Sequence, residues 1–261
     1  MSRRIVSEVL DILEREISRI GEVKVEKVCL GLGYTGVKLT TGHAGVCHSL
    51  QAEMAIQCCQ VVRRAGSLAG SPALDLAHLS ESWDLGEKVV GVAALNALSQ
   101  IVFEEKPQRY RFEERNLIDE IEIREGDTVA MVGNIKPFIP AIKSKTRSLY
   151  ILERNPMREE NVFPDLAGEE IIPKASVVII TGSAIANGTI DRLLELSRKA
   201  REIAISGPSA SLIPDPLFCR GVKLIGGIRV TDPEKLFQII AEGGGTPQIK
   251  PAVRFTIIKP G

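Results

Sequence analysis

The sequence lacks net charge, and it lacks long blocks of one sign. Its 261 residues hold 33 Lys and Arg against 33 Asp and Glu, and the two signs are interspersed. A neutral balance of this kind gives no electrostatic reason to expect DNA, RNA or an anionic membrane surface as a partner. No apolar run approaches the roughly 20 residues that span a bilayer, and the amphipathic N-terminus is unlike a secretory signal. We therefore expect a cytoplasmic protein whose partner is neither a nucleic acid nor a membrane.

The sequence also lacks a cysteine or histidine framework. Its five cysteines are an odd count without regular spacing, which predicts reduced thiols. No C-x-x-C or H-x-x-x-H spacing brings two metal ligands onto one side. Adjacent residues of a strand point to opposite faces, so Cys47 and His48 do not converge. The motifs of serine hydrolases, P-loop enzymes and zinc hydrolases are missing too. The cysteines and histidines that lie close enough in sequence to be considered as metal ligands are His43, Cys47, His48, Cys58, Cys59 and His78.

The first part of the chain predicts a small α+β domain, residues 1–105. Apolar residues at helical spacing predict helices over 4–19, 49–64, 72–81 and 84–103. The stretch 23–49 predicts a strand, a glycine-rich turn and a returning strand. Residues 104–126 are charged and form a connection, with a helix of their own around Glu113–Asp119.

The second part, residues 106–261, predicts a Rossmann-like, mostly parallel sheet with helices on its faces. Short β-branched runs alternate with helical stretches. A last strand, 253–259, is expected to close one edge. Helices are expected at 189–200 and 232–244, with N-caps at Thr189 and Asp232. The remaining strands are expected at 128–133, 148–153, 176–182, 202–207 and 222–227.

A ligand crevice is expected where the parallel strands end. In an open α/β sheet, ligands bind outside the carboxyl ends of the strands, near the point where the strand order reverses. Four successive runs end in glycines and in short polar or charged residues, which let a backbone approach a ligand and bind it by hydrogen bonds. The alternative is that these are ordinary loop residues. They are Gly133, Asn134, Glu153, Thr181, Gly182, Ser183, Asn187, Gly207, Pro208 and Ser209.

Glu153 is a candidate for binding the ribose of a nucleotide. It follows Gly133 by twenty residues, the spacing at which an acidic side chain binds ribose in Rossmann domains. The second and third glycines of that motif are missing, which disfavours NAD and FAD but leaves a smaller nucleoside open. Alternatively, Glu153 is a solvated charge paired with Arg154.

The N-terminal part offers three more candidates. The segment GLGYTG, residues 31–36, places Tyr34 and Thr35 in a glycine-rich turn. Asn96 interrupts an apolar helix and needs hydrogen-bond partners when buried. Asn96 is therefore either a ligand-binding residue or a satisfied structural amide.

Several of these segments resemble the heavy-metal chelation family: GLGYTGVKL, GVAALNALS, VAMVGNIKPFIPAIKSK, LYILERNP, VVIITGSAIANGTIDRLLEL and ISGPSASLIPDPLF. The resemblance covers nearly the whole chain. It implies a domain similar to the enolase N-terminal domain before a Rossmann-like domain, with the site between them. One side of that site would hold Asn134, Glu153, Ser183, Asn187 and Ser209, and the other Tyr34, Thr35 and Asn96. Enolase activity is not implied, because the enolase barrel is missing.

Three hypotheses follow. The first is a protein that binds a small molecule or metal chelate in the interdomain cleft, with a divalent or heavy metal ion as the implied cofactor. The second is an enzyme that uses a nucleoside-type cofactor, such as S-adenosylmethionine or a mononucleotide. The third is a non-enzymatic assembly module that forms a homo-oligomer.

Overall fold

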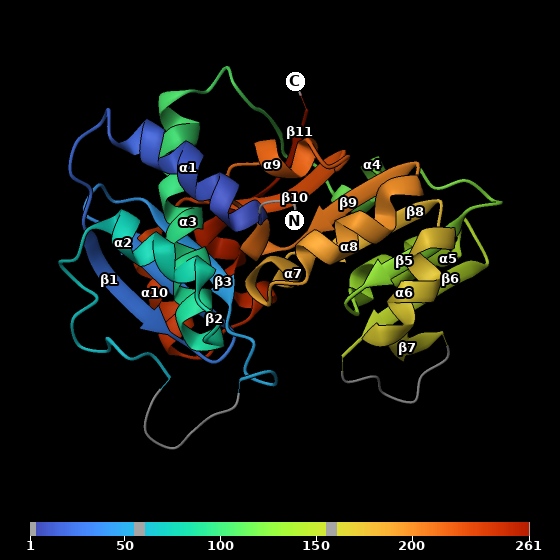
Figure 1. Ribbon diagram of the computed structural model, residues 1–261, viewed down its shortest axis with the longest axis horizontal. Coiled ribbons are helices and arrows are strands. Elements are labelled where there is room, and N and C mark those ends of the chain that lie inside the picture. Colours follow the sequence, from blue (N-terminus) through green and yellow to red (C-terminus); the bar gives the residue numbers. More distant parts are fainter. Residues whose placement is uncertain (1–3, 55–60, 155–160, 261) are drawn as a thin grey trace.

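The computed structural model describes residues 4–54, 61–154 and 161–260 of the chain. They form a three-stranded antiparallel sheet and an eight-stranded, mostly parallel sheet. Helices pack around both sheets (Figure 1). The expected α/β class is confirmed, whereas the domain boundary at 105/106 and the enolase-like label stay predictions.

The small sheet has one strand more than the sequence predicted. It is an antiparallel meander of β1 (Val25–Leu30), β2 (Tyr34–Leu39) and β3 (Ala44–His48). Tyr34 and Thr35 begin β2 and do not lie in a turn. The helix expected over 49–64 is wrong for the described residues 49–54 and 61–64, none of which is helical, and Leu50 has a φ of 52°. The rest of that prediction includes 55–60, which lie outside the described residues.

The helices of this half are α1 (Ile5–Ile17), α2 (Ala73–Ala77), the 3₁₀ helix η1 (His78–Glu81) and α3 (Leu85–Glu105). Asp84 begins α3 by accepting a hydrogen bond from the Glu87 amide, at 3.1 Å. By length and composition α3 could cross a membrane. However, 89% of its most apolar stretch is buried inside the protein. α3 is therefore the core helix of a globular protein, while the cytoplasmic location stays a prediction.

The large sheet has the strand order β4-β11-β10-β9-β8-β5-β6-β7. From β10 to β7 all neighbours are parallel, whereas β11 runs antiparallel to both β10 and β4. The strands are β4 (Arg111–Glu113), β5 (Thr128–Val132), β6 (Ser148–Glu153), β7 (Val162–Pro164), β8 (Val177–Thr181), β9 (Glu202–Ser206), β10 (Leu224–Val230) and β11 (Val253–Lys259).

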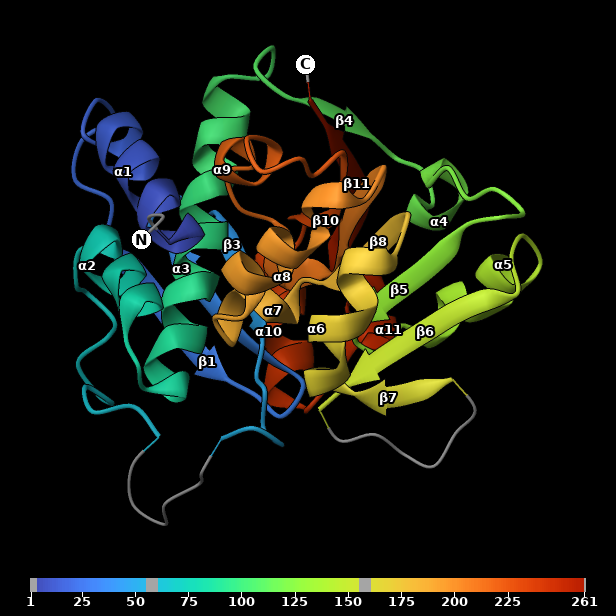
Figure 2. The ribbon, with the colours of Figure 1, turned by 45° about the vertical axis from the view of Figure 1, so that its right-hand side comes forward.

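Both edges of this sheet differ from the prediction (Figure 2). The edge beside β11 is covered by β4, so β11 does not close the sheet. The helix expected around Glu113–Asp119 begins later, as α4 (Leu117–Glu120). At the other edge lies β7, which the sequence analysis did not predict. Strands of three residues carry too few positions to show a pattern.

Short helices cover the large sheet. Asp232 caps α10 as expected, accepting from the Lys235 amide at 2.9 Å. Thr189 does not cap α8 with its side chain, because its hydroxyl donates to Asn187 Oδ1 at 2.7 Å. The helices are α5 (Ile139–Lys143), α6 (Gly168–Ile171), α7 (Ser183–Ala186), α8 (Ile190–Leu196), α9 (Asp215–Phe218), α10 (Pro233–Ala241) and α11 (Thr246–Ile249), with 3₁₀ turns η2 (Lys136–Phe138), η3 (Asp165–Ala167), η4 (Ile172–Lys174), η5 (Ser197–Lys199), η6 (Pro208–Ala210) and η7 (Lys250–Ala252).

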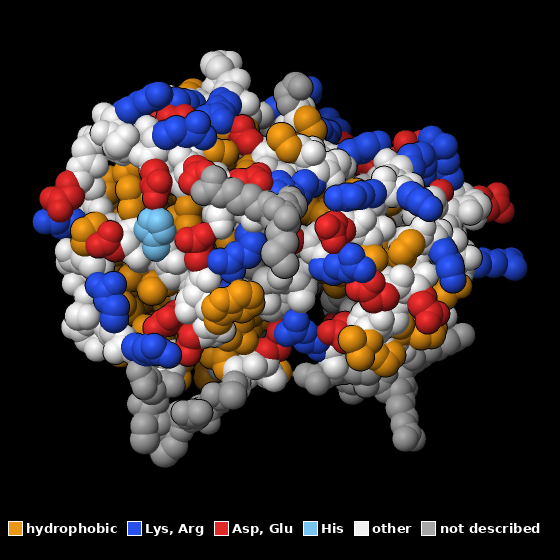
Figure 3. All heavy atoms as spheres, viewed as in Figure 1, with side chains coloured by type: hydrophobic (Ala, Val, Ile, Leu, Met, Phe, Trp, Pro, Cys, Tyr) orange, Lys and Arg blue, Asp and Glu red, His pale blue; other side chains and the backbone are white. Residues whose placement is uncertain are grey.

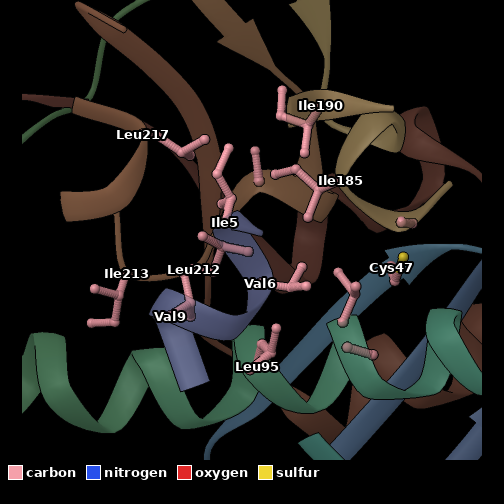
Figure 4. Packing of buried hydrophobic residues seen from close by; sticks show 14 of the residues in the cluster. Ile5, Val6, Val9, Cys47, Leu95, Ile185, Ile190, Leu212, Ile213 and Leu217 are labelled. Atoms are coloured by element: carbon pink, nitrogen blue, oxygen red, sulfur yellow. The ribbon is translucent and has the colours of Figure 1, made fainter. Parts of the chain in front are cut away.

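One hydrophobic core joins the two halves of the chain. Ile5 and Val9 of α1 lie between Leu95 of α3 and the apolar residues Leu212 and Leu217 that follow β9 (Figure 4). α10 returns to pack against β1 and β2. This packing fixes the small sheet against the large one, and the shared core includes the segment after β9.

Gly45 of β3 provides a test of this packing. A Cβ there would lie 2.2 Å from the Ala97 nitrogen and 2.5 Å from the Ala93 carbonyl oxygen, both in the backbone of α3. Gly45→Ala is expected to lower the free energy of unfolding by about 1–3 kcal/mol through overpacking.

Gly126→Ala is the matched control, because nothing lies within 4 Å of a Cβ there. It is expected to be neutral or stabilising by up to ~1 kcal/mol. Urea titrations of both variants measure the difference, and equal midpoints would contradict the close packing of β3 on α3.

Candidate functional site

The strand order of the large sheet reverses at β5. From β5 the chain passes to β6 on one side, and β8 later pairs on the other side. The loops after β5 and β8 therefore leave in opposite directions, which opens a crevice at the carboxyl ends of these strands.

Two cavities lie along this crevice. The first cavity, of about 350 Å³, extends over the ends of β5 and β6. The second cavity, of about 620 Å³, lies beside the end of β9 and the neighbouring Gly226 and Gly227 of β10. In Figure 3 the surface is indented between the lobe that carries the small sheet and the lobe of β6 and β7. The residues that line both cavities are His48, Asn134, Ile135, Thr181 and Ser183.

Most of the residues predicted from the strand ends line this crevice. Both cavities therefore border the edge that the sequence rule indicated. The first cavity contains Gly133, Glu153 and Asn187, the second contains Tyr34, Gly207, Pro208 and Ser209, and both contain Asn134, Thr181 and Ser183.

Asn134 occupies the centre of the crevice. It follows Gly133, whose φ of 87° turns the chain away from β5. Its backbone N–H donates to Glu153 Oε2 at 2.8 Å, so Glu153 holds the loop after β5. The side-chain oxygen Oδ1 is buried and has no partner among the described residues. A buried acceptor without a partner destabilises the protein, and a ligand can relieve this.

Three predicted residues do not line either cavity. Thr35 is buried, with its hydroxyl 3.2 Å from Ser49 Oγ. Gly182 lies against Ala210, whose nitrogen would be 3.1 Å from a Cβ at this position. Asn96 is the third of these residues, and it likewise lines neither cavity.

Asn96 is a buried structural amide. Its Nδ2 donates to the carbonyl oxygens of Val46 at 2.7 Å and of Ser209 at 3.1 Å. It thereby ties β3 to the turn after β9. Its Oδ1 has no partner in the described part of the chain.

The N-terminal wall consists of Tyr34 and His48, which are paired across β2 and β3. Their rings meet edge to face, with centroids 6.0 Å apart. The Tyr34 hydroxyl lies 2.6 Å from Thr246 Oγ1, and the His48 amide donates to Ser209 Oγ at 2.9 Å. The side chain of His48 reaches solvent, yet the protein packed around it lowers the pKa of His48 by desolvation. Its imidazole is therefore neutral at pH 7.

The described residues do not fit a bare metal ion. No group of three or more His, Cys, Asp and Glu side chains converges among them. Cys47 is fully buried, and burial raises the pKa of its thiol to about 12. Cys47 also lines neither cavity, and the thiolate that would bind a metal is costly to form at this buried position. His43 pairs with Glu104 at 2.8 Å and His78 pairs with Glu14 at 3.0 Å, outside both cavities.

Cys58 and Cys59, which the sequence analysis had set beside these histidines, lie outside the described residues.

The first cavity is bordered by ion pairs that the sequence analysis did not predict. Arg154 pairs with Glu53, and its Nε lies 3.4 Å from Asp165. The suggested pairing of Glu153 with Arg154 is not present, because Glu153 accepts from the Asn134 amide instead. Burial raises the pKa of Glu53 above its ordinary value. Glu53 was missed because it falls in the segment wrongly predicted as a helix.

Two family models and one curated protein are similar to this chain in sequence. The DUF364 family model, described as "Putative heavy-metal chelation", matches residues 116–259, and the DUF4213 model, with the same description, matches 13–99. An uncharacterized Methanocaldococcus jannaschii protein is 27% identical over 160 residues, which span 60% of each chain.

Two solved structures, both of unknown function and from the DUF364 family, cover nearly the whole chain. The Pyrococcus horikoshii protein has a TM-score of 0.80 at 26% identity, covering 96% of this chain and 99% of its own. The Desulfitobacterium hafniense protein has a TM-score of 0.78 at 27% identity, covering 97% and 98%. Because the DUF364 model matches more than half of the sequence, this chain belongs to that family.

Proposed function

We propose that the protein binds a small organic ligand, either a metal chelate or the chelator itself, in the crevice between Asn134 and His48. The observation that carries this proposal is the buried Oδ1 of Asn134. It has no hydrogen-bond partner among the described residues, and Asn134 borders both cavities. A ligand that donates an N–H or O–H to this oxygen would gain a bond that the free protein lacks.

The walls of the crevice suit an organic molecule. Hydroxyls of Thr181 and Ser183 and the neutral ring of His48 lie beside the apolar side chains of Ile135 and Phe138. Small-molecule sites typically combine such apolar walls with a few fixed polar groups. The two cavity volumes also lie in or near the range of such sites.

The same chemistry favours a chelate over a free ion. A heavy metal ion requires several deprotonated sulfur or nitrogen ligands that converge on one point. The described crevice offers one imidazole, and the buried thiol of Cys47 lines neither cavity. A metal that enters as cargo would therefore keep the donor atoms of its chelator, while the protein binds the outer surface of the complex.

A second candidate function is the use of a nucleoside-type cofactor. Glu153 favours it, because this carboxylate ends β6 at the switch point and lines the first cavity. One of its oxygens already accepts from the Asn134 amide. Titration with S-adenosylmethionine tests this function. Equal affinity of the wild type and Glu153→Gln would remove Glu153 from a role in binding ribose.

Thermal unfolding with three kinds of additive tests the main proposal. The additives are divalent metal ions alone, chelators alone and preformed metal–chelator complexes. We expect chelators or complexes to raise the Tm by several degrees, since a ligand at 100 times its Kd adds about 2.7 kcal/mol of stability. The metal ions alone are expected to have no such effect. Equal stabilisation by the free ions, or none by any chelator or complex, would contradict the proposal.

A pair of asparagine variants separates binding from folding. Asn134→Ala removes an unpartnered buried oxygen, so the free energy of unfolding without ligand should stay within about 0.5 kcal/mol or rise. The ligand-induced increase in Tm should fall, because the shared wall loses its acceptor. Urea titration and thermal unfolding measure the two quantities.

Asn96→Ala is the matched control. It removes two buried hydrogen bonds and should lower the free energy of unfolding by about 2–3 kcal/mol, while a ligand still raises the Tm. The proposal would be contradicted if Asn134→Ala responded to ligand like the wild type.

A further inference from the structure

The two cavities differ in charge. Among the described residues, the first cavity is bordered by more carboxylates than cations, namely Glu53, Glu153, Asp165 and Glu169 against Arg154 and Arg192. The described lining of the second cavity contains two cations, Arg115 and Lys250, and no carboxylate. A ligand that extends through the crevice therefore meets opposite charges at its two ends.

The carboxylates of the first cavity are only partly neutralised. Arg154 serves both Glu53 and Asp165. Arg192 binds Glu169 through two nitrogens, at 2.9 and 2.5 Å. Glu153 has no cationic partner among the described residues and accepts only the Asn134 amide. Negative charge is therefore in excess at this end, and an ammonium group would compensate it.

The cations of the second cavity are likewise only partly neutralised. Lys250 is exposed and forms no ion pair with any described residue. Arg115 binds Glu113 and Glu120, which also bind Lys259 and, in the case of Glu113, Arg111. Three cations thus share two carboxylates, so positive charge is in excess beside this cavity.

The wall that the two cavities share has no formal charge. Asn134, Thr181 and Ser183 are neutral, and so is the imidazole of His48. Low-dielectric walls strengthen the field of the groups at the two ends, because water screens them less than it does on an open surface. The polarity of the crevice consequently fixes the direction in which a ligand with two unlike ends lies.

We propose that the ligand is an amino carboxylate, with its ammonium end beside Glu153 in the first cavity and its carboxylate end beside Lys250 and Arg115 in the second. This inference rests on the proposed function and narrows it to chelators of the aminocarboxylate class. Polyamine chelators match only the first cavity, and polycarboxylate chelators match only the second.

Three chelators of comparable size test this assignment by isothermal titration. Ethylenediamine-N,N-diacetate carries a primary amine at one end and two carboxylates at the other, triethylenetetramine carries only amines, and citrate carries only carboxylates. We expect the aminocarboxylate to bind about tenfold more tightly than either of the others. The difference should shrink as salt is raised, since ions screen the charges.

Two charge-neutralising variants locate the ends of the ligand. Lys250→Gln should weaken citrate and the diacetate about five- to tenfold and leave triethylenetetramine unchanged. Glu153→Gln keeps an oxygen that can accept the Asn134 amide, and it should weaken triethylenetetramine and the diacetate but not citrate. Lys235→Gln and Glu125→Gln, at exposed positions outside both cavities, are the matched controls.

The outcomes separate this inference from the proposed function. If none of the three chelators binds, alone or as a metal complex, both the proposed function and this inference are overturned. If citrate or triethylenetetramine binds as tightly as the diacetate, only the amino carboxylate assignment is overturned. The same holds if the two variants behave like their controls. Tighter binding of the diacetate, with the opposite selectivity in the two variants, supports the assignment.

Discussion

A buried amide in α3 holds the two walls of the crevice together. Asn96 donates one hydrogen bond to the carbonyl of Val46 in β3 and another to the carbonyl of Ser209 in the turn after β9. The amide of His48 adds a third link, to Ser209 Oγ. The end of β3 is thus fixed above the carboxyl ends of the parallel strands. These links help to position the N-terminal wall of the crevice, although neither cavity is lined by Asn96 itself.

The parallel sheet could be predicted from the sequence because its strands are buried on both faces. The runs that become β5, β6, β8 and β9 are short and rich in apolar and β-branched residues, and glycines or polar or charged residues end them. Parallel strands end at the same edge, so the meeting of Asn134, Glu153 and Ser183 followed from this pattern alone.

The parts of the structure that could not be predicted depend on contacts between segments that are distant in the sequence. β4 and β7 are three residues long, and only pairing with a neighbouring strand makes them strands. Arg115 and Lys250 both line the second cavity because β4 pairs antiparallel with β11, which brings the end of β4 toward η7 at the start of β11. No spacing in the sequence joins residues 115 and 250, so the positive end of the crevice could not be predicted. Burial of Asn96 was recognised as a possibility, but its two partners lie 50 and 113 residues away.

The proposed ligand differs in form from the one that the family description suggests. The description names heavy-metal chelation, while the described crevice has hydroxyls, an amide and one neutral imidazole in place of a cluster of metal ligands. A protein that handles a chelator needs hydrogen bonds and charges matched to the organic molecule. In the proposed site, a neutral wall separates Glu153 from Lys250, which matches an organic molecule with two unlike ends. A bare cation would not interact with both ends.

A crystal structure grown with the most stabilising chelator, or its metal complex, tests the central claim most directly. We predict electron density in the crevice, with a donor group within hydrogen-bonding distance of Asn134 Oδ1 and with protein atoms bound to the organic part. Density elsewhere on the molecule would contradict this account, and so would a metal ion coordinated directly by several protein side chains in the crevice.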